Sequence, residues 1–236
     1  MGNSTFKKHI PNTITCCNLL SGCVAATFAF DKAYTIAFVC IIMGAVFDFF
    51  DGLTARALKV SSPIGKELDS LADVITFGLA PSVMAFSWLR ECTATHLDQP
   101  IALVIPYAAF LLVAFSALRL AKFNVDERQT SSFIGLPTPA NALFWGALIL
   151  GSHDMVVGLT YGWVLVIALV LLFSWLLIAE IPMFSLKFKS LAWKANRIAY
   201  IFLLISLILL IILGLNGLSA VIGWYIILSI MTNRKA

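Results

Sequence analysis

Long apolar runs separated by short polar stretches dominate the sequence. Eight runs approach or reach the length of a transmembrane helix, at about residues 14–30, 33–50, 70–89, 101–120, 133–150, 161–181, 198–213 and 218–231. A helix needs roughly 20 mostly apolar residues to cross a bilayer. The last two runs are short and closely spaced, so they are expected to form a hairpin after six core spans. The pattern predicts an all-α, polytopic helix bundle: one membrane domain over residues 1–236, with its core spans at about 14–181.

The composition agrees with a protein embedded in lipid. Hydrophobic residues make up 61% of the chain and charged residues only 12%, and the mean hydropathy is +0.96. Such a chain has too little polar surface to cover a soluble globule. No soluble domain follows the first apolar run, so this run is expected to be a span rather than a cleaved signal peptide.

Basic residues are distributed unequally between the two sets of loops. With eight spans, one side collects fourteen of the sixteen: Lys7, Lys8, Arg56, Lys59, Lys66, Arg119, Lys122, Arg128, Lys187, Lys189, Lys194, Arg197, Arg234 and Lys235. The other side has only Lys32 and Arg90. The positive-inside rule makes the first side, with both termini, cytoplasmic. The basic residues are scattered and have no aromatic platform among them, so nucleic-acid binding is not expected.

Four aspartates lie close together in a chain with only twelve acidic residues. Asp48 and Asp51 are three residues apart, and Asp69 and Asp73 are four apart, so each pair lies on one helix face. A short turn between the two helices would bring the four carboxylates together. Carboxylates about 4 Å apart repel each other by roughly 4 kcal/mol at an effective dielectric constant near 20, so the cluster requires cations.

All-oxygen ligands of this kind suit hard cations such as Mg²⁺, Mn²⁺ and Ca²⁺, and no sulfur or imidazole ligand is near to favour zinc. Two ions bridged by four carboxylates would form a site for a diphosphate, because they can neutralise its charge and stabilise a departing oxygen. The sequence therefore predicts a dinuclear Mg²⁺ or Mn²⁺ centre, which Ca²⁺ could occupy in a crystal.

Small and basic residues accompany the aspartates. Gly52 and Gly65 have no side chain and Ala55 has a small one, so a nucleotide can approach the helix surfaces closely. The planar guanidinium group of Arg56 suits phosphate. Together the residues form the pattern D-x-x-D-G-x-x-A-R-(x8)-G-x-x-x-D-x-x-x-D. Its eight fixed positions would match by chance on the order of 10⁻¹⁰ times per start site.

This pattern resembles the signature of the CDP-alcohol phosphotransferases at every fixed position. The resemblance implies metal ligands at Asp48, Asp51, Asp69 and Asp73. It implies a catalytic base that deprotonates the acceptor alcohol at Asp73. It implies binding of CDP-diacylglycerol by Gly52, Ala55, Arg56, Ser62 and Gly65. The family fold implies six core helices, often in a homodimer, around a polar cavity open to the cytoplasm and the lipid.

Further segments resemble the serine-using, membrane-embedded branch of this family: residues 11–22, 69–81, 117–124 and 135–140. The resemblance implies transfer of a phosphatidyl group from CDP-diacylglycerol to L-serine at the inner membrane, with the active site toward the cytoplasm. Arg119 could bind the serine carboxylate bidentately or simply extend to the interface. Asn12 or Thr13 also suits the cap of the first helix.

Two alternatives stay open from the sequence. The same chemistry could use another acceptor, such as glycerol 3-phosphate or inositol phosphate, which would call for an additional basic cluster beside the site. A transporter or ion channel with intramembrane carboxylates would instead place acidic residues at mid-span and repeat the motif in two halves. The aspartates are predicted at span ends, and the motif occurs once.

Overall fold

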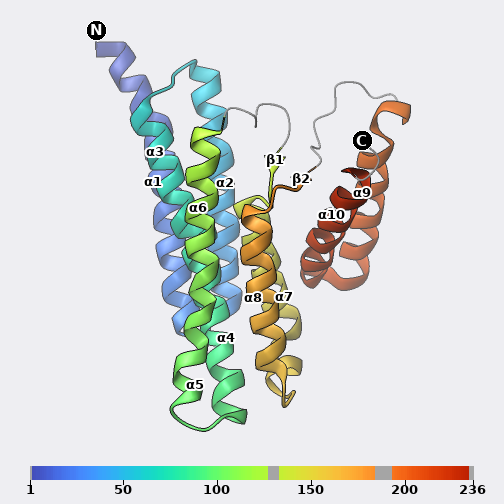
Figure 1. Cartoon of the computed structure of the whole chain (residues 1–236). Coiled ribbons are helices and arrows are strands. Elements are labelled where there is room, and N and C mark those ends of the chain that lie inside the picture. The colour runs from blue at the N-terminus through green and yellow to red at the C-terminus, as the bar shows by residue number, and fades with distance from the viewer. Residues whose placement is uncertain (1, 127–132, 184–192, 234–236) are drawn as a thin grey trace.

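The structure, a computed structural model, describes residues 2–126, 133–183 and 193–233, and these are almost entirely helical (Figure 1). The α-helices are α1 Gly2–Phe30, α2 Tyr34–Leu58, α3 Pro63–Asp73, α4 Ala80–His96, α5 Ile101–Val104, α6 Leu111–Val125, α7 Thr138–Val157, α8 Gly162–Ile178, α9 Trp193–Leu213 and α10 Gly217–Asn233. A π-helical segment, η1 (Val74–Leu79), joins α3 to α4, and 3₁₀ segments η2 (Ile105–Phe110) and η3 (Gly214–Asn216) precede α6 and α10. The predicted all-α polytopic fold is confirmed.

Six helical stretches within the described residues are long and apolar enough to cross a membrane, and α8 is a shorter apolar helix. Pro63–His96 is the most enclosed of the six, and α4 supplies many of its buried side chains. The sixth stretch, Asn196–Thr232, includes most of α9 and α10. Figure 1 shows these two helices folded back on each other, as the predicted terminal hairpin requires.

Several helix ends differ from the prediction. The second helix runs on from residue 50 to Leu58, and the third begins at Pro63 instead of residue 70. The fifth predicted run started at residue 133, but a short strand precedes α7, which begins at Thr138. Helix α1 begins at Gly2, so Asn12 and Thr13 lie inside it and the expectation that either caps the helix was wrong.

Local chemistry explains the sharp turn between α2 and α3. Lys59 closes α2 in the left-handed conformation (φ 52°), and its N–H bonds to carbonyl groups of the last turn. The Ser62 hydroxyl caps α3 by accepting a hydrogen bond from the Gly65 N–H at 3.0 Å. Pro63 then occupies the first helical turn, where no N–H is needed. The turn reverses the direction of the chain, and Asp69 of α3 comes close to Asp48 and Asp51 of α2.

Helix α1 packs closely against η1 and α2 at Thr76. A side chain at Gly22 or Gly44 would collide with Thr76, because an added Cβ would lie 2.4 Å from its Oγ1 or Cγ2 respectively. The Thr76 hydroxyl donates a hydrogen bond to the Asn18 carbonyl at 2.9 Å. This contact holds α1 beside the segment that follows Asp73.

A polar network joins three parts of the bundle at the end away from the aspartates. Glu91 of α4 accepts a hydrogen bond from the Tyr34 hydroxyl at 2.7 Å and lies 3.3 Å from the Lys32 ammonium group. The His153 ring of α7 lies 3.2 Å from the same carboxylate. The network therefore ties the α1–α2 turn to α4 and α7.

Strands β1 (Phe133–Ile134) and β2 (Pro182–Met183) pair antiparallel and connect the start of α7 to the chain after α8. The Gly135 N–H donates to the Ile181 carbonyl at 2.9 Å. Gly135 has a positive φ of 77°, and a Cβ there would lie 2.6 Å from a backbone carbonyl oxygen of α8. Only glycine fits this corner, which determines where α7 begins.

Candidate active site

Three carboxylates from two helices meet at the α2–α3 end of the bundle. Asp48 and Asp51 of α2 and Asp69 of α3 each place an oxygen within 4.8 Å of the others. At that separation each pair of ionised carboxylates repels by about 3.5 kcal/mol for an effective dielectric constant of 20. Among the described residues, no lysine or arginine forms an ion pair with any of the three. The group fits a hard cation with oxygen ligands.

The fourth aspartate lies next to this group rather than within it. Asp73 ends α3, is 9% exposed, and is close enough to the other three carboxylates to interact with them electrostatically. The Asn18 side chain donates a hydrogen bond from Nδ2 to Asp73 Oδ1 at 3.2 Å. The π-helical segment η1 begins directly after Asp73, and such segments in helices often accompany functional sites.

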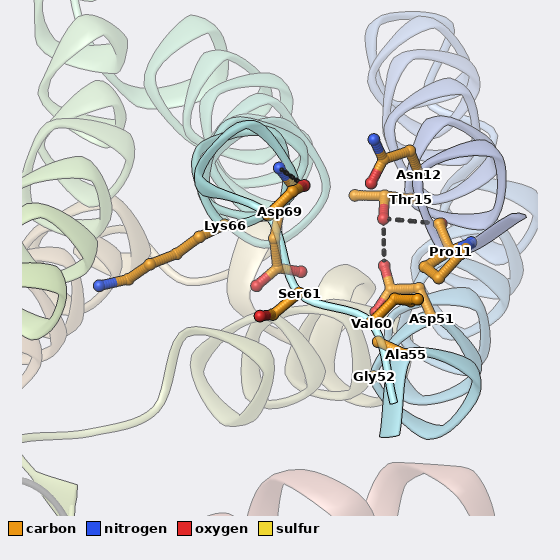
Figure 2. A pocket seen from close by; sticks show the side chains of 12 residues that line it. Pro11, Asn12, Thr15, Asp51, Gly52, Ala55, Val60, Ser61, Lys66 and Asp69 are labelled. Atoms are coloured by element: carbon orange, nitrogen blue, oxygen red, sulfur yellow. Dashed lines mark hydrogen bonds between the residues drawn. The ribbon is translucent and has the colours of Figure 1, made fainter. Parts of the chain in front are cut away.

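A cavity of about 210 Å³ opens beside the carboxylates (Figure 2). Its walls come from α1, α2, the α2–α3 turn and α3: Pro11, Asn12, Thr15, Asp51, Gly52, Ala55, Val60, Ser61, Ser62, Gly65, Lys66 and Asp69. Figure 2 shows the Asp51 and Asp69 carboxylates on different sides of the view, with the Lys66 chain extending away from Asp51. The Lys66 ammonium group donates to the Asn124 carbonyl at 3.0 Å.

The remaining predicted donor-site residues divide between this cavity and its border. Gly52, Ala55, Ser62 and Gly65 line the cavity, whereas Arg56 does not. The Arg56 guanidinium folds back over Gly52, where a Cβ would lie 3.3 Å from Nη1. The Ser62 hydroxyl already caps α3. A Cβ on Gly65 would lie 3.0 Å from that hydroxyl, so glycine keeps this wall open.

Helix α1 supplies two polar side chains to which the sequence assigned no role. The Thr15 hydroxyl donates a hydrogen bond to Asp51 Oδ2 at 2.6 Å, and Asn18 binds Asp73. Both side chains are buried. The available sequence signal was the segment 11–22, which supported a choice of acceptor but indicated no contact with the aspartates.

Arg119 of α6 is 7% exposed and lies near Asp73. Its Nη1 donates to the Thr138 hydroxyl of α7 at 3.4 Å, and its guanidinium carbon lies 5.6 Å from the centre of the Phe123 ring. The side chain is therefore packed inside the bundle, which does not fit a residue that merely extends to the interface.

A second, smaller cavity of about 40 Å³ adjoins Arg119. Two basic and two acidic residues contribute to its walls, together with apolar residues of α6, β1 and α8: Arg119, Lys122, Phe123, Asp126, Ile134, Leu177, Ile178 and Glu180. A cavity of this size holds about three water molecules. The mixture of charges suits a small zwitterion better than a phosphate dianion.

The sequence model of the family described as CDP-alcohol phosphatidyltransferase matches residues 8–175. The matched segment contains the three-carboxylate group, Asp73, every residue of the larger cavity, Arg119 and Thr138. The described helices α9 and α10 follow it.

Several curated proteins that carry the name CDP-diacylglycerol–serine O-phosphatidyltransferase are similar in sequence. One from Helicobacter pylori is 30% identical over 225 residues, which cover 94% of this chain and 89% of that protein. One from Bacillus subtilis is 37% identical over 131 residues, or 56% of this chain and 70% of the relative. One from Methanocaldococcus jannaschii is 32% identical over 134 residues, or 57% of each chain.

Proposed function

The chain belongs to the CDP-alcohol phosphatidyltransferase family, and on this premise we propose that it transfers the phosphatidyl group of CDP-diacylglycerol to L-serine. The products are phosphatidylserine and CMP, so the protein is a transferase of phospholipid biosynthesis. The observation that carries the proposal is the buried Arg119, which bonds to Thr138 inside the bundle within electrostatic range of Asp73, in a site whose aspartates suit a diphosphate donor. Relatives with the same named activity support the choice of serine.

The larger cavity is assigned to the CDP part of the donor. Its walls include Gly52, Ala55, Ser62 and Gly65, with Arg56 at the border. Exposed apolar side chains flank it on the same helices, at Leu53, Ile64 and Leu71. The acyl chains can therefore stay in the bilayer while the headgroup enters the protein.

Asp48, Asp51 and Asp69 are assigned to Mg²⁺ or Mn²⁺, with Asp73 beside them, and two ions are proposed, as the sequence predicted. When bound, such ions neutralise the diphosphate and stabilise the oxygen that leaves with CMP. Asp51 is oriented toward this role by the Thr15 hydroxyl.

Asp73 is assigned as the base that accepts the proton of the serine hydroxyl. The serine oxygen then forms a bond to the diacylglycerol-linked phosphorus, and the bond from that phosphorus to the CMP oxygen breaks, so that CMP leaves with the electron pair. Asn18 holds Asp73 Oδ1 and thereby orients the second oxygen of the carboxylate. Arg119 is assigned to the serine carboxylate, because its planar fork of donors matches a carboxylate.

A second acceptor class, the alcohol phosphates, agrees less well with the walls of the smaller cavity. Asp126 and Glu180 stand there with Arg119 and Lys122, and carboxylates beside a phosphate dianion would oppose its binding. A transporter is not proposed, because Asp51 and Asp69 lie about two helical turns from the α2–α3 turn, toward one end of the bundle, and the motif occurs once in the sequence.

An acceptor panel tests the function directly. Purified protein with CDP-diacylglycerol and Mg²⁺ or Mn²⁺ is expected to release CMP with L-serine, and to release little with glycerol 3-phosphate, inositol phosphate or inositol. Phosphatidylserine should appear in equal molar amount to CMP. Preferential use of a phosphorylated alcohol would refute serine as the acceptor but would leave the assignment of the donor site intact.

The Thr15 hydroxyl is expected to be needed for full activity. Thr15→Val keeps the shape of the side chain but removes the hydrogen bond to Asp51 Oδ2. Loss of a group that orients a metal ligand commonly lowers activity or metal affinity by about 10- to 100-fold. CMP release should fall by that factor and recover partly at high Mn²⁺. Thr15→Ser retains the hydroxyl and is the matched control; equal activity in the Val and Ser variants would contradict the role.

We further propose that the aspartate-bearing end of the bundle faces the cytoplasm of a cell whose inner membrane holds the protein. Arg56, Lys59 and Lys66 lie at that end, and Lys32 and Arg90 lie toward the other. Five basic residues of the orientation argument lie outside the described residues: Arg128, Lys187, Lys189, Arg234 and Lys235. The homodimer that the resemblance implies stays a prediction.

Cysteine labelling tests this orientation in intact cells. In a variant that lacks the five native cysteines, a single cysteine at exposed Lys59 is expected to react only with a membrane-permeant maleimide. A cysteine at exposed Thr95, at the far end of α4, should also react with an impermeant maleimide. Opposite labelling at the two positions would reverse the proposed topology.

A further inference from the structure

Unpaired polar atoms are concentrated in one part of the bundle interior. Nine buried side-chain nitrogen and oxygen atoms among the described residues have no hydrogen-bond partner. Four of the nine belong to three residues of two helices, α6 and α7: Ser116 Oγ, Arg119 Nε, and Nδ2 and Oδ1 of Asn141. A buried polar atom without a partner destabilises the folded state, so a group of them indicates a place for a ligand.

A hydrogen bond connects α6 and α7 beside these three residues. Helix α6 ends and α7 begins at the same end of the bundle, so the two helices run in opposite directions. The hydrogen bond from Arg119 to Thr138 shows which turn of α6 lies at the same height in the bundle as the first turn of α7. Ser116 lies one helical turn before Arg119 on the same face of α6, and Asn141 lies one turn after Thr138 on the same face of α7. Because the two helices run in opposite directions, both residues lie one turn further into the bundle than the Arg119–Thr138 bond.

The acceptor end of the proposed reaction lies beside this group. Segment η1 packs on α6 at Ser116, where a Cβ on Gly78 would be 3.2 Å from the serine Cβ. Asp73 immediately precedes η1 and is near Arg119. Ser116 and Asn141 are both fully buried. A small polar molecule here would have its reacting end toward Asp73 and the remainder among the unpaired atoms.

We propose that Ser116, Arg119 and Asn141 form the subsite for the amino-acid head of the acceptor. Arg119 binds the carboxylate, Asn141 Oδ1 accepts a hydrogen bond from the ammonium group, and Ser116 Oγ donates to the carboxylate. The subsite rests on the proposed function and deepens it, since it makes Asn141 the residue that selects an acceptor with an α-amino group. The Oδ1 atom of Asn141 then has a hydrogen-bond partner only when serine is bound.

Truncated acceptors separate this role from a structural one. The full-length protein in detergent is assayed for CMP release with L-serine and with 3-hydroxypropionate, which lacks the ammonium group. In Asn141→Leu, kcat/KM for L-serine is expected to fall by about 10- to 150-fold, the effect of losing a hydrogen bond to a charged group. The kcat/KM for 3-hydroxypropionate is expected to stay the same.

Thermal stability gives a second readout. Because Asn141→Leu removes a buried amide without a partner, the unfolding temperature of the ligand-free protein is expected to be unchanged or to rise by about 2–4 °C. Ser206→Ala removes an unpaired buried hydroxyl from α9 and is the matched control; it should leave the kinetics for both acceptors unaltered. Ser116→Ala, a smaller change, should lower kcat/KM for both acceptors, because both carry the carboxylate to which Ser116 donates, and it tests the subsite if the leucine variant does not fold.

Two kinetic outcomes would overturn the subsite: unchanged kcat/KM for L-serine in the Asn141 and Ser116 variants, or an equal loss for both acceptors in the Asn141 variant. A lower unfolding temperature in Asn141→Leu would show a structural partner for the amide and would also overturn it. If the unmodified protein prefers a different acceptor in the panel, that result refutes the proposed function, and the proposed subsite is refuted together with it.

Discussion

Replacing Asp69 by asparagine is expected to lower CMP release from CDP-diacylglycerol by about 10²- to 10³-fold, equivalent to several kcal/mol of transition-state stabilisation. Asp69 is the carboxylate that α3 contributes to the group completed by Asp48 and Asp51 of α2. Asparagine preserves the size of the side chain but removes its negative charge, which weakens the affinity for a divalent cation. Asp48→Asn and Asp51→Asn are expected to behave in the same way.

The folded bundle should tolerate this substitution. Three clustered carboxylates repel one another, so Asp69→Asn is expected to leave the unfolding temperature of the metal-free protein unchanged or to raise it. Membrane insertion should be normal. A loss of activity with retained stability would therefore indicate a defect in cation binding and not in folding.

Glu67→Gln is the matched control, because it removes an exposed carboxylate two residues earlier on α3. It should retain normal activity. EDTA should abolish CMP release by the unmodified protein, and added Mg²⁺ or Mn²⁺ should restore it. Binding of Mn²⁺ measured by paramagnetic resonance should drop in Asp69→Asn but not in Glu67→Gln. Full activity in EDTA would remove the metal centre from the mechanism.

Arg119→Lys is expected to lower kcat/KM for L-serine by about 10- to 150-fold, through the loss of a charge-assisted hydrogen bond to the serine carboxylate. Lysine keeps the positive charge but cannot reproduce the planar fork of donors. The KM for CDP-diacylglycerol should change little, because Arg119 does not line the larger cavity. Steady-state kinetics with each substrate varied in turn measures both effects.

The chain offers a close control for this substitution at the other end of the bundle. Arg90 lies over the Phe86 ring at 5.8 Å, much as Arg119 lies over Phe123 at 5.6 Å. Arg90→Lys removes a comparable arginine–aromatic contact far from the aspartates and should not alter the kinetics for either substrate. An unchanged KM for serine in Arg119→Lys would refute the carboxylate assignment and leave the aspartate site unaffected.

The sequence by itself determined the helical membrane fold, the position of the aspartates on their helices, and the family. Each of these depends on neighbours along the chain. The length of an apolar run decides whether a helix can span the bilayer. A spacing of three or four residues decides which side chains share a helix face. The compact pattern from Asp48 to Asp73 therefore contains most of the residues that are assigned to the donor site.

Helix boundaries were predicted less well, because hydrophobicity alone does not mark where a helix ends. Ser62 and Pro63 start α3 seven residues before the apolar run begins, since a cap and a proline can begin a helix among polar residues. At the start of α7, the tight corner at Gly135 prevents the helix from beginning at residue 133.

Only the tertiary structure decided which distant side chains complete the site. Thr15 reaches Asp51 across 36 positions, and Asn18 reaches Asp73 across 55. The packing also separates Asp73 from the three-carboxylate group and turns Arg119 inward to Thr138. The same packing places Ser116 and Asn141 at one level. Helix periodicity specifies the face on which a residue lies, but the approach of two helices depends on close contacts such as those of Thr76 with Gly22 and Gly44.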